Sequence, residues 1–581
     1  MNISSSKLKK LIENAGLTDK KTLDKVSKEA QEKGEDFEEY IIRKKIVAEK
    51  NLREIQSSFL KIPFVDLTRK QIPKDTLFLI PEATAKEYKV IAYEQDEKNV
   101  KLAMTDPGDL QTIEFVRKKT GRSIISYLTT SDSIENALRQ YRKNIRSQFD
   151  EIIQKNIEKA EKQGEKDPEK LALNLPVIRI VDSLIDYGIN EEASDIHIEP
   201  VEQEINIRYR IDGILHNVLT LPKQIHDGVV ARIKILSNLK LDEHRLPQDG
   251  RFKKEVRDQK YAFRVSVLPI MDGEKVVLRI LKEGGVNLAL EQLGFQHSAL
   301  EKIKVAIKKP NGMILVTGPT GSGKTTTLYT ILNALNIPGV NISTLEDPVE
   351  YRMSGVNQSQ VKPKIGFSFA NGLRSLLRQD PDIIMVGEIR DKETAELAIH
   401  AAMTGHLVLS TLHTNSAAGA LPRLIDMGIN PFLIASTVNV IIAQRLVRRI
   451  CPNCIQSYNL TDAQVSDLEK QVDMDITLAA MVKEGIIAEE KEKQGLKKMN
   501  FYKGAGCEQC GGEGYKGRIG VFEALEITDA ISDLVMKKAP DEEIENKAIE
   551  EQGMIIMIQD GFIKARTGIT SIEEVLRVTK E

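Results

Sequence analysis

The segment Gly318–Thr325 constrains the fold of this chain more than any other feature. It reads GPTGSGKT and matches the pattern G-x-x-x-x-G-K-[ST] at every fixed position. The apolar run MILVT at 313–317 precedes it, and TTTLYTILNAL at 325–335 can continue as a helix. A chance glycine-rich turn is the alternative interpretation, which this strand–loop–helix context disfavours. The sequence therefore predicts a phosphate-binding loop in an α/β domain.

The residue types of this loop suit a bound nucleoside triphosphate. Glycines let backbone N–H groups turn inward around phosphates, and the N-terminus of the following helix adds its dipole. Lys324 places a positive charge on the β- and γ-phosphate oxygens, and the Thr325 hydroxyl is a ligand for Mg²⁺. We therefore expect ATP and Mg²⁺ to be bound by Gly318, Pro319, Thr320, Gly321, Ser322, Gly323, Lys324, Thr325 and Thr326.

The region around this loop alternates helical patterns with short apolar runs. From about residue 293 to 449 the runs are MILVT, VNISTLE, DIIMV and HLVLSTL. Such an alternation predicts a doubly wound, mostly parallel sheet.

Carboxylates follow two of these predicted strands. DIIMVGE ends at Glu388, and strand ends in an open α/β sheet point toward the ligand crevice. Glu388 is therefore predicted to polarise the attacking water or to hold a metal-bound water. The segment TLEDPVE supplies a second cluster, Glu346, Asp347 and Glu350, for which a solvated turn is the alternative interpretation.

Two histidines flank the predicted strand LVLST. His406 and His413 are seven residues apart on an extended segment, so they point to opposite faces unless a bulge intervenes. This spacing argues against a shared metal ion. Either histidine can serve as a γ-phosphate sensor, and a packed, hydrogen-bonded histidine is the alternative for each.

The module before the loop is rich in arginine. Phosphoryl transfer usually needs a positive group at the γ-phosphate beyond the loop lysine. Most arginines on such strands are solvated or paired with nearby acids, so any single assignment stays open. Together they indicate that this module forms one wall of an ATP site. The arginines are Arg208, Arg210, Arg245, Arg251, Arg264 and Arg279.

All four cysteines of the chain occur in two C-x-x-C turns, Cys451/Cys454 and Cys507/Cys510. Each turn can present two thiolates to a tetrahedral ion, which predicts a closed structural zinc site. Residues 455–506 would then form a helical excursion between the two turns. A redox pair is the alternative, but CEQCGGEG lies in a glycine-rich knuckle and not at the start of a helix after a strand.

The length, charge and hydropathy of the chain argue against several classes of protein. At 581 residues, the chain is long enough for three or four domains. A net charge of -2 gives no overall basic attraction to nucleic acid or anionic lipid. We find no apolar run of transmembrane length and no signal-peptide pattern, so we expect a cytoplasmic protein.

The predicted organisation is multidomain α/β. Apolar positions at 8, 11, 17, 23 and 26 recur 29 residues later, which indicates two helical pairs. We place a helical repeat at 7–60, an α/β module at 61–142, a charged linker at 143–173, an arginine-bearing α/β domain at 174–285, the nucleotide-binding domain at 286–449, a tetracysteine element at 450–520 and a C-terminal helical segment at 521–581.

Several motifs occur together in one order: GPTGSGKTTTLYT, STLEDPVEY, LRSLLRQDPDIIMVGEIRD and TGHLVLSTLHTN. With these motifs the chain resembles the type II/type IV secretion ATPase superfamily, in its pilus-assembly and type II secretion branch. SDIHIEP, RYRIDG and RLPQDGR resemble the second N-terminal domain of that branch, and the cysteine pairs resemble its zinc element. The resemblance covers most of the chain.

The resemblance implies a RecA-like core preceded by a PAS-like domain. It implies that Gly318–Thr325 is the Walker A loop, that 346–350 is the aspartate box, that Glu388 is the Walker B glutamate and that His406 and His413 form the histidine box. Arg210, Arg245 and Arg264 would complete ATP sites at domain or subunit boundaries of a homohexamer.

The resemblance also implies mechanical work at the inner face of the cytoplasmic membrane. ATP hydrolysis would drive domain rotations that act on an inner-membrane platform protein, with pilus alignment proteins as further candidate partners. The long N-terminal extension and the tetracysteine element favour assembly over retraction. The long excursion between the cysteine pairs favours a type IV pilus over type II secretion, which stays open.

Two functions of other classes are alternatives. One is a scaffold that binds ATP without turning it over, which the carboxylates at 346–350 and 388 disfavour. The other is a DNA-transport ATPase, which the neutral charge balance disfavours, so we expect no nucleic-acid partner. The N-terminal repeats resemble a family domain that binds cyclic di-GMP in some members. Their starts, KLK at 7–9 and DFE at 36–38, lack its arginine and glycine, which argues against cyclic di-GMP and favours docking to the platform.

Overall fold

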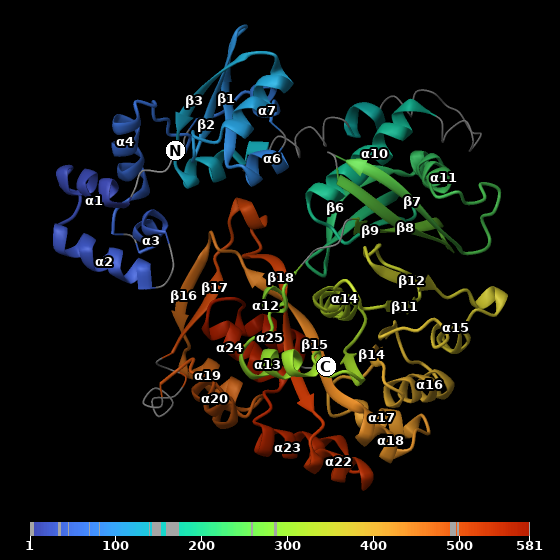
Figure 1. The fold of residues 1–581 in the computed structure, drawn as a ribbon. Helices are drawn as coiled ribbons and strands as arrows, with labels where there is room; N and C mark the ends of the chain where they lie inside the picture. Colours follow the sequence, from blue (N-terminus) through green and yellow to red (C-terminus); the bar gives the residue numbers. More distant parts are fainter. Residues whose placement is uncertain are drawn as a thin grey trace.

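The computed structural model describes most of the chain in four parts. The described residues are 5–32, 36–44, 46–68, 70–80, 82–138, 140–141, 153–157, 174–256, 259–283, 288–488, 496 and 499–579. Figure 1 shows a helical N-terminal part and a small α/β module on one side, an antiparallel domain on the other, and the largest part below them. Among the described residues, no helix is long and apolar enough to cross a membrane.

The N-terminal part is built from two helical pairs, as the repeat predicts. Gly16 lies between the first two helices and Ile46 between the last two. Leu8, Leu23 and Tyr40 are buried where the four helices meet, because the repeated apolar positions face one another. The helices are α1 Ser5–Asn14, α2 Lys20–Glu32, α3 Phe37–Arg43 and α4 Glu49–Leu60.

The next module is a three-stranded sheet with helices beside it. β1 Val90–Gln95 pairs antiparallel with β2 Asn99–Met104. β2 then pairs parallel with β3 Ser123–Leu128 across α7 Leu110–Thr120. Two short helices, α5 Lys74–Leu77 and α6 Glu82–Glu87, precede the sheet.

The predicted linker at 143–173 lies largely outside the described residues. Its described part, 153–157, is helical, and Ile153 and Ile157 are buried in the core of the following domain. This part therefore packs against that domain, because its two isoleucines lie one turn apart on the same face of the helix.

The arginine-bearing domain is one six-stranded sheet, antiparallel throughout, with strand order β6-β5-β4-β9-β8-β7. Its helices are α10 Leu175–Asn190 and α11 His226–Leu236, which pack side by side. Alternate strand residues such as Ile196, Phe263 and Val276 fill the core. The strands are β4 Asp195–Pro200, β5 Glu204–Ile211, β6 Ile214–Pro222, β7 Gln248–Val256, β8 Gln259–Ile270 and β9 Gly273–Lys282.

The nucleotide-binding domain contains a seven-stranded sheet with order β12-β11-β13-β14-β10-β15-β18. Its first six strands are parallel to their neighbours, which confirms the predicted doubly wound sheet. The parallel strands are β10 Gly312–Thr317, β11 Ile342–Glu346, β12 Val356–Gln360, β13 Ile383–Val386, β14 Leu407–Leu412 and β15 Val438–Ile450.

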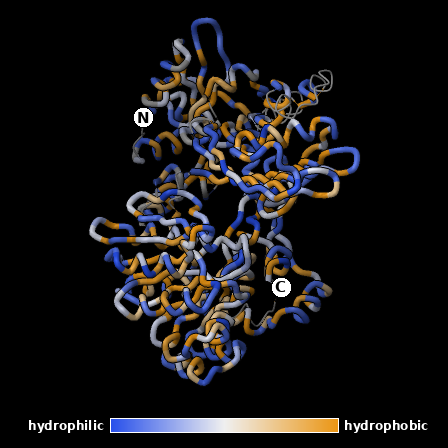
Figure 2. The backbone as a smooth tube through the Cα atoms, turned by 90° about the vertical axis from the view of Figure 1, so that its right-hand side faces the viewer, coloured by the Kyte–Doolittle hydropathy of each residue, from blue (hydrophilic) through white to orange (hydrophobic). Residues whose placement is uncertain are grey.

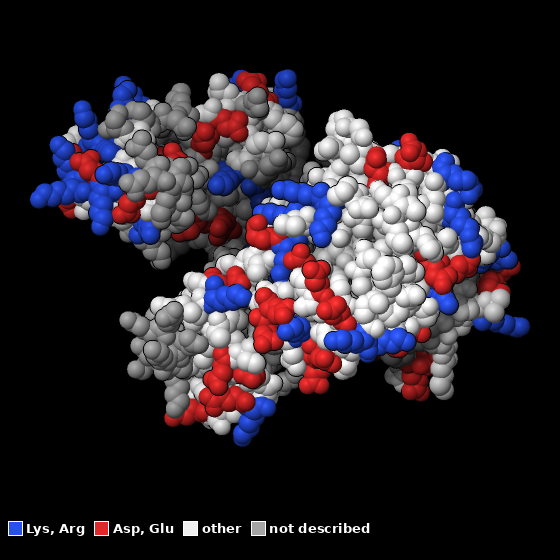
Figure 3. Space-filling view, turned by 60° about the horizontal axis from the view of Figure 1, so that its bottom comes forward, with Lys and Arg blue, Asp and Glu red and all other residues white. Residues whose placement is uncertain are grey.

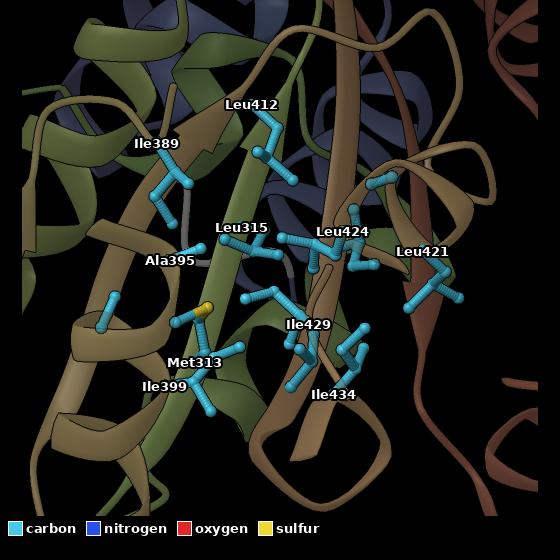
Figure 4. Close-up of a cluster of buried hydrophobic side chains, with 14 of the residues drawn as sticks. Met313, Leu315, Ile389, Ala395, Ile399, Leu412, Leu421, Leu424, Ile429 and Ile434 are labelled. Carbon is cyan, nitrogen blue, oxygen red and sulfur yellow. The ribbon is translucent and has the colours of Figure 1, made fainter. Parts of the chain in front are cut away.

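Helices cover both faces of this sheet, so the central strands are buried on both sides. One face packs against α15 Phe369–Leu376, α16 Lys392–Met403, α17 Ala420–Asp426 and α18 Pro431–Thr437, around Met313 and Leu315 (Figure 4). The other packs against α12 Leu290–Leu293, α13 His297–Ala306 and α14 Lys324–Leu335. Figure 2 shows hydrophobic segments inside this part and hydrophilic ones in peripheral loops.

The predicted boundary after residue 520 is wrong. β18 Tyr515–Glu526 crosses it and pairs antiparallel with β15 as the seventh strand of the sheet. The next helices, α22 Asp529–Met536 and α23 Asp541–Gln552, add Ile531 and Ile544 to the core of that sheet. Pairing across residues 451–514 is non-local, so the local pattern gave no signal for it.

The excursion between the cysteine pairs folds against the C-terminal helices. β16 Ile455–Asn459 and β17 Asn500–Gly504 form an antiparallel pair, and α19 Asp462–Glu469 and α20 Met474–Lys483 lie between them in sequence. These helices share a core with α24 Met557–Arg566 and α25 Ile572–Thr579, and we call this unit the C-terminal module. On the face shown in Figure 3, acidic and basic side chains lie around a broad area of uncharged residues.

Candidate active site and metal centre

The loop 318–323 joins the buried strand β10 to α14, as predicted. Gly318, Gly321 and Gly323 have φ angles of 146°, 81° and 91°, a region that favours glycine. A Cβ on Gly318 would lie 2.6 Å from the carbonyl oxygen of Gln444. The loop therefore needs glycine both for its backbone angles and for its approach to β15.

Lys324 begins α14 and turns back over the loop. Its Nζ donates to the carbonyl oxygens of Gly318 at 2.7 Å and Pro319 at 3.2 Å. Burial lowers the pKa of Lys324 to about 8, and the charge of Glu388 opposes that shift. The ammonium group thus lies inside the loop. Phosphate oxygens of a bound nucleotide would replace the two carbonyl oxygens as acceptors of its hydrogen bonds.

The remaining residues of the predicted loop set differ in their exposure to solvent. Thr320, Gly321, Thr325 and Thr326 are exposed, and Pro319 is half-buried. Ser322 is buried. The exposed hydroxyl of Thr325 in the first helical turn is where a metal ligand of a bound nucleotide is expected.

A buried glutamine that the sequence analysis missed holds the loop in place. Gln444 on β15 donates to the carbonyl oxygen of Ser322 at 2.7 Å and accepts from Thr327 Oγ1 at 2.8 Å. It is 1% exposed. The available signal was a polar residue inside the apolar run VNVIIAQRLV.

Glu388 lies just beyond the end of β13, at the edge of the sheet where the loop 318–323 begins. Its carboxylate contacts Arg390 at 2.5 Å and His413 Nε2 at 3.4 Å. Since β13, β14 and β10 are parallel, their C-terminal ends share this edge. The structure therefore brings Lys324, Glu388 and His413 to one edge of the sheet.

His406 lies at the other end of β14. Its Nδ1 is 2.9 Å from the carbonyl oxygen of Ala401, at the end of α16. Along a strand of this length the two histidines are separated by about 20 Å. A γ-phosphate sensor at His406 is therefore inconsistent with this position, whereas His413 remains a candidate.

Glu346 is in the interior and not beside Lys324. Its carboxylate accepts hydrogen bonds from Tyr329 on α14, from Thr344 Oγ1 at 2.7 Å and from Gln358 Nε2 at 3.2 Å. Burial raises its pKa above the usual glutamate value. These contacts link α14, β11 and β12, which departs from the predicted catalytic role because β11 is separated from β10 by two strands.

The other two acids of the predicted box differ from Glu346. Asp347 is exposed and precedes a cis peptide bond to Pro348. Glu350 forms a bidentate ion pair with Arg264, with N–O distances of 2.7 and 3.3 Å. Arg264 also donates to the carbonyl oxygen of Val349 at 3.3 Å. Arg264 therefore joins the arginine-bearing domain to the loop that follows β11.

Four arginines of the sheet form one transverse row. Together with one aspartate they lie directly opposite one another on successive antiparallel strands and so share a face. Their order across the sheet is Arg251, Arg264, Arg279, Asp195 and Arg210. Asp195 lies 2.9 Å from Arg279 and 3.6 Å from Arg210. Cross-strand register brought these residues together, which the linear sequence did not show.

Arg245 is on an exposed loop between α11 and β7. The loop is anchored by the buried Lys234, whose Nζ donates to the carbonyl oxygen of Glu243 at 2.8 Å and pairs with Glu274 at 2.7 Å. Arg245 thus projects from a fixed loop into solvent, away from the ion pairs of the arginine row.

The four cysteines converge, as predicted for a metal site. Their sulfur atoms all lie within 4.8 Å of one another, with separations of 3.7, 3.8 and 3.9 Å for three pairs. Tetrahedral zinc with bonds of about 2.3 Å requires sulfur separations of about 3.8 Å. The β16–β17 pair brings the end of one C-x-x-C turn beside the start of the other.

The surroundings of the four sulfur atoms differ, since burial raises the pKa of the Cys451 thiol and raises that of the Cys454 thiol to about 12, whereas Cys510 accepts backbone hydrogen bonds. Backbone N–H groups of Cys507 and Gly514 donate to Cys510 Sγ at 3.2 and 3.1 Å. Despite burial, hydrogen bonds lower the pKa of the Cys510 thiol to about 7. The fit to a closed four-cysteine zinc site therefore rests on the separations of the sulfur atoms.

Comparison with known proteins agrees with this geometry. Residues 170–577 match the family model "Type II/IV secretion system protein" and residues 60–148 match the "MshEN domain". The chain belongs to the type II/IV secretion system protein family. This family membership and the nucleotide site together identify it as an ATPase of that family.

Several relatives span nearly the whole chain. The type IV pilus assembly ATPase PilB of Myxococcus xanthus is 37% identical over 98% of this chain and 98% of its own length. The type II secretion system protein E of Xanthomonas campestris is 38% identical over 92% of each. Among solved structures, the ATPase DotB of Yersinia pseudotuberculosis superposes with a TM-score of 0.50 at 21% identity, covering 69% of this chain and 93% of DotB, and supports the fold alone.

Proposed function

We propose that this protein is an ATP-hydrolysing motor that powers assembly of a type IV pilus. The observation that carries the proposal is the convergence of Lys324, Glu388 and His413 at one edge of the sheet. Lys324 neutralises phosphate charge, and Glu388 orients and activates the attacking water. His413 holds the Glu388 carboxylate and contacts the γ-phosphate. When bound at Thr325, Mg²⁺ supplies further charge neutralisation on the phosphates.

Arginines would complete the site from the preceding domain. Arg264 already reaches the loop after β11 through Glu350. Arg245 and Arg210 have side chains that are partly or fully exposed, so they can meet a nucleotide of a neighbouring subunit. We propose a homohexamer in which such contacts complete each ATP site. Glu346 and Glu350 are then assigned to holding β11 and the loop after it in place, and not to chemistry.

Type IV pilus assembly is favoured by relatives that match this chain from end to end. Two relatives named type IV pilus assembly ATPases match 98% and 100% of it, including the N-terminal helices. Type II secretion is the alternative, supported by the Xanthomonas relative and by others 44% identical over 70% of the chain. In either case we propose action on an inner-membrane platform protein from the cytoplasmic side.

We further propose that the four cysteines hold structural zinc. Four thiolates fill a tetrahedral shell, so the site leaves no position for a substrate. The ion would fix the two C-x-x-C turns where β15 leaves the sheet and β18 enters it.

The proposal is tested by phosphate release from purified protein with Mg²⁺ and ATP. We expect Lys324→Ala to lose nucleotide binding, and Glu388→Gln to bind nucleotide but hydrolyse it about 100-fold or more slowly. Glu393→Gln, an exposed acid on α16, is the matched control and should keep wild-type rates. Wild-type protein that binds ATP without releasing phosphate would identify a scaffold instead.

Pilus assembly and secretion are separated in the host organism. Deleting the gene should remove surface pili and leave secreted proteins in the medium unchanged. Loss of secretion with intact pili would assign the protein to type II secretion.

A further inference from the structure

Glu523 is a buried acid on β18 that the proposed chemistry does not use. It is 2% exposed, and its pKa is raised to about 7 because burial disfavours the charged form. The charged groups that face it are Arg445 on β15, which lowers the pKa, and Glu545 on α23, which raises it. Burying a carboxylate costs free energy unless hydrogen bonds or charged partners compensate for the lost solvation.

One oxygen of Glu523 holds the loop that follows β14. Glu523 Oε1 accepts the backbone N–H of Ala417 at 2.5 Å. The same loop carries His413, which contacts Glu388, and Thr414, whose N–H donates to Thr317 Oγ1 at 2.8 Å. The loop 413–419 therefore connects the end of β10, the candidate catalytic carboxylate and Glu523.

The other oxygen holds the C-terminal module. Glu523 Oε2 accepts the backbone N–H of Met557, the first residue of α24, at 3.2 Å. A carboxylate is favourable there because the helix N-terminus carries unpaired N–H groups and a positive dipole end. α24 continues into the core shared with α20 and β17, the strand that leads to Cys507.

We propose that Glu523 is a positioning residue that couples the loop 413–419 to α24, so that displacement of the loop during ATP turnover moves the C-terminal module. The coupling rests on the proposed function of the ATP site and adds a mechanical route from that site. Glu523 does not touch the nucleotide loop, so it acts only through the backbone groups of Ala417 and Met557.

Hydrogen–deuterium exchange tests this coupling with Mg²⁺ and the non-hydrolysable analogue AMP-PNP as the probe. In the wild-type chain, we expect the analogue to slow exchange at least twofold in peptides covering 318–327, 413–419 and 554–563. In Glu523→Gln, whose amide accepts only one N–H well, peptide 554–563 should lose this response while the first two keep it. Glu545→Gln is the matched control and should keep all three.

A second pair of variants changes the other partner of the contact, the backbone N–H of Met557 on α24. Met557→Pro removes the N–H donor without breaking the helix, since proline is accommodated at the first helical position and Ile556 is already extended with ψ of 160°. Met557→Ala shortens the side chain but keeps the donor. We expect the proline variant, and not the alanine variant, to lose the response of 554–563.

The outcomes separate the two proposals. No response of peptide 318–327 in the wild-type chain would contradict the ATP site itself. A wild-type response at 318–327 with an unchanged response of 554–563 in Glu523→Gln and Met557→Pro would overturn the coupling alone. KM for ATP should stay within about twofold of wild type in both variants, because neither residue contacts the nucleotide loop; a larger KM change would also overturn a purely coupling role.

Discussion

Gln444 on β15 donates its amide N–H to the carbonyl oxygen of Ser322 at 2.7 Å and accepts the Thr327 hydroxyl at 2.8 Å. One buried side chain therefore fixes the phosphate-binding loop at its turn and again at the first turn of α14. We expect Gln444→Leu to cost about 1–3 kcal/mol of unfolding free energy, because it leaves a buried carbonyl unpaired.

The same substitution should raise KM for ATP about tenfold and leave kcat nearly unchanged, since the loop is displaced but Glu388 is not. Thermal unfolding and steady-state kinetics measure both effects. Thr327→Val, which removes only one of the two bonds, is the matched control and should show the smaller effect. A reduced Tm with unchanged KM would show that Gln444 is structural only.

Nucleotide affinity should depend on the charge of Lys324. Its pKa of about 8 in the nucleotide-free protein is lowered by burial, so the side chain is charged below pH 8 and loses its proton above it. The dissociation constant of Mg·ADP should therefore rise with pH between 7 and 9, approaching tenfold per pH unit. Calorimetry of Lys324→Arg, which stays charged throughout, should give a flatter profile; parallel profiles would contradict the assignment.

Glu346 and Glu388 should respond differently to the same change. Glu346→Gln keeps a hydrogen-bonding group among Tyr329, Thr344 and Gln358, so we expect kcat within about tenfold of wild type. Glu388→Gln should lower kcat about 100-fold or more. If Glu346→Gln loses as much activity as Glu388→Gln at an unchanged Tm, the catalytic role predicted from the sequence is restored.

Metal removal should expose all cysteines at once. The chain has four cysteines, and all lie in the candidate zinc site, so thiol titration reports that site alone. We expect one zinc per chain by metal analysis, few reactive thiols before chelation and four afterwards, with a lower Tm. Reactive thiols in freshly purified, metal-free protein of unchanged stability would exclude structural zinc.

The buried Glu523 should make stability depend on pH. Its folded-state pKa of about 7 is above the usual 4.5, so its contribution is fully present below about pH 4.5 and is lost as pH rises through 7. Between pH 5 and 8 the wild-type chain should lose about 2 kcal/mol relative to Glu523→Gln. Denaturant unfolding of both proteins across this range measures the difference, and a constant difference would contradict the raised pKa.

Much of the site followed from the sequence because its parts are local. The loop 318–325 is a run of consecutive residues whose glycines and lysine indicate phosphate binding. Each C-x-x-C turn is likewise only four residues long. Strands β10, β11, β13 and β14 were predicted for the same reason, because a short apolar run indicates a strand that is buried on both faces. β12, with the sequence VNQSQ, was missed because an edge strand needs no apolar run.

The remaining assignments depend on which strands are neighbours. The sequence alone determined a phosphate-binding loop, a tetracysteine site and a doubly wound domain, because each is encoded within a short segment. Only the tertiary structure decided that His413 and not His406 meets Glu388, that Glu346 is interior, that β18 completes the sheet and that Gln444 holds the loop. Strand order and register join residues that are far apart in the chain, and no local pattern of side chains specifies that pairing.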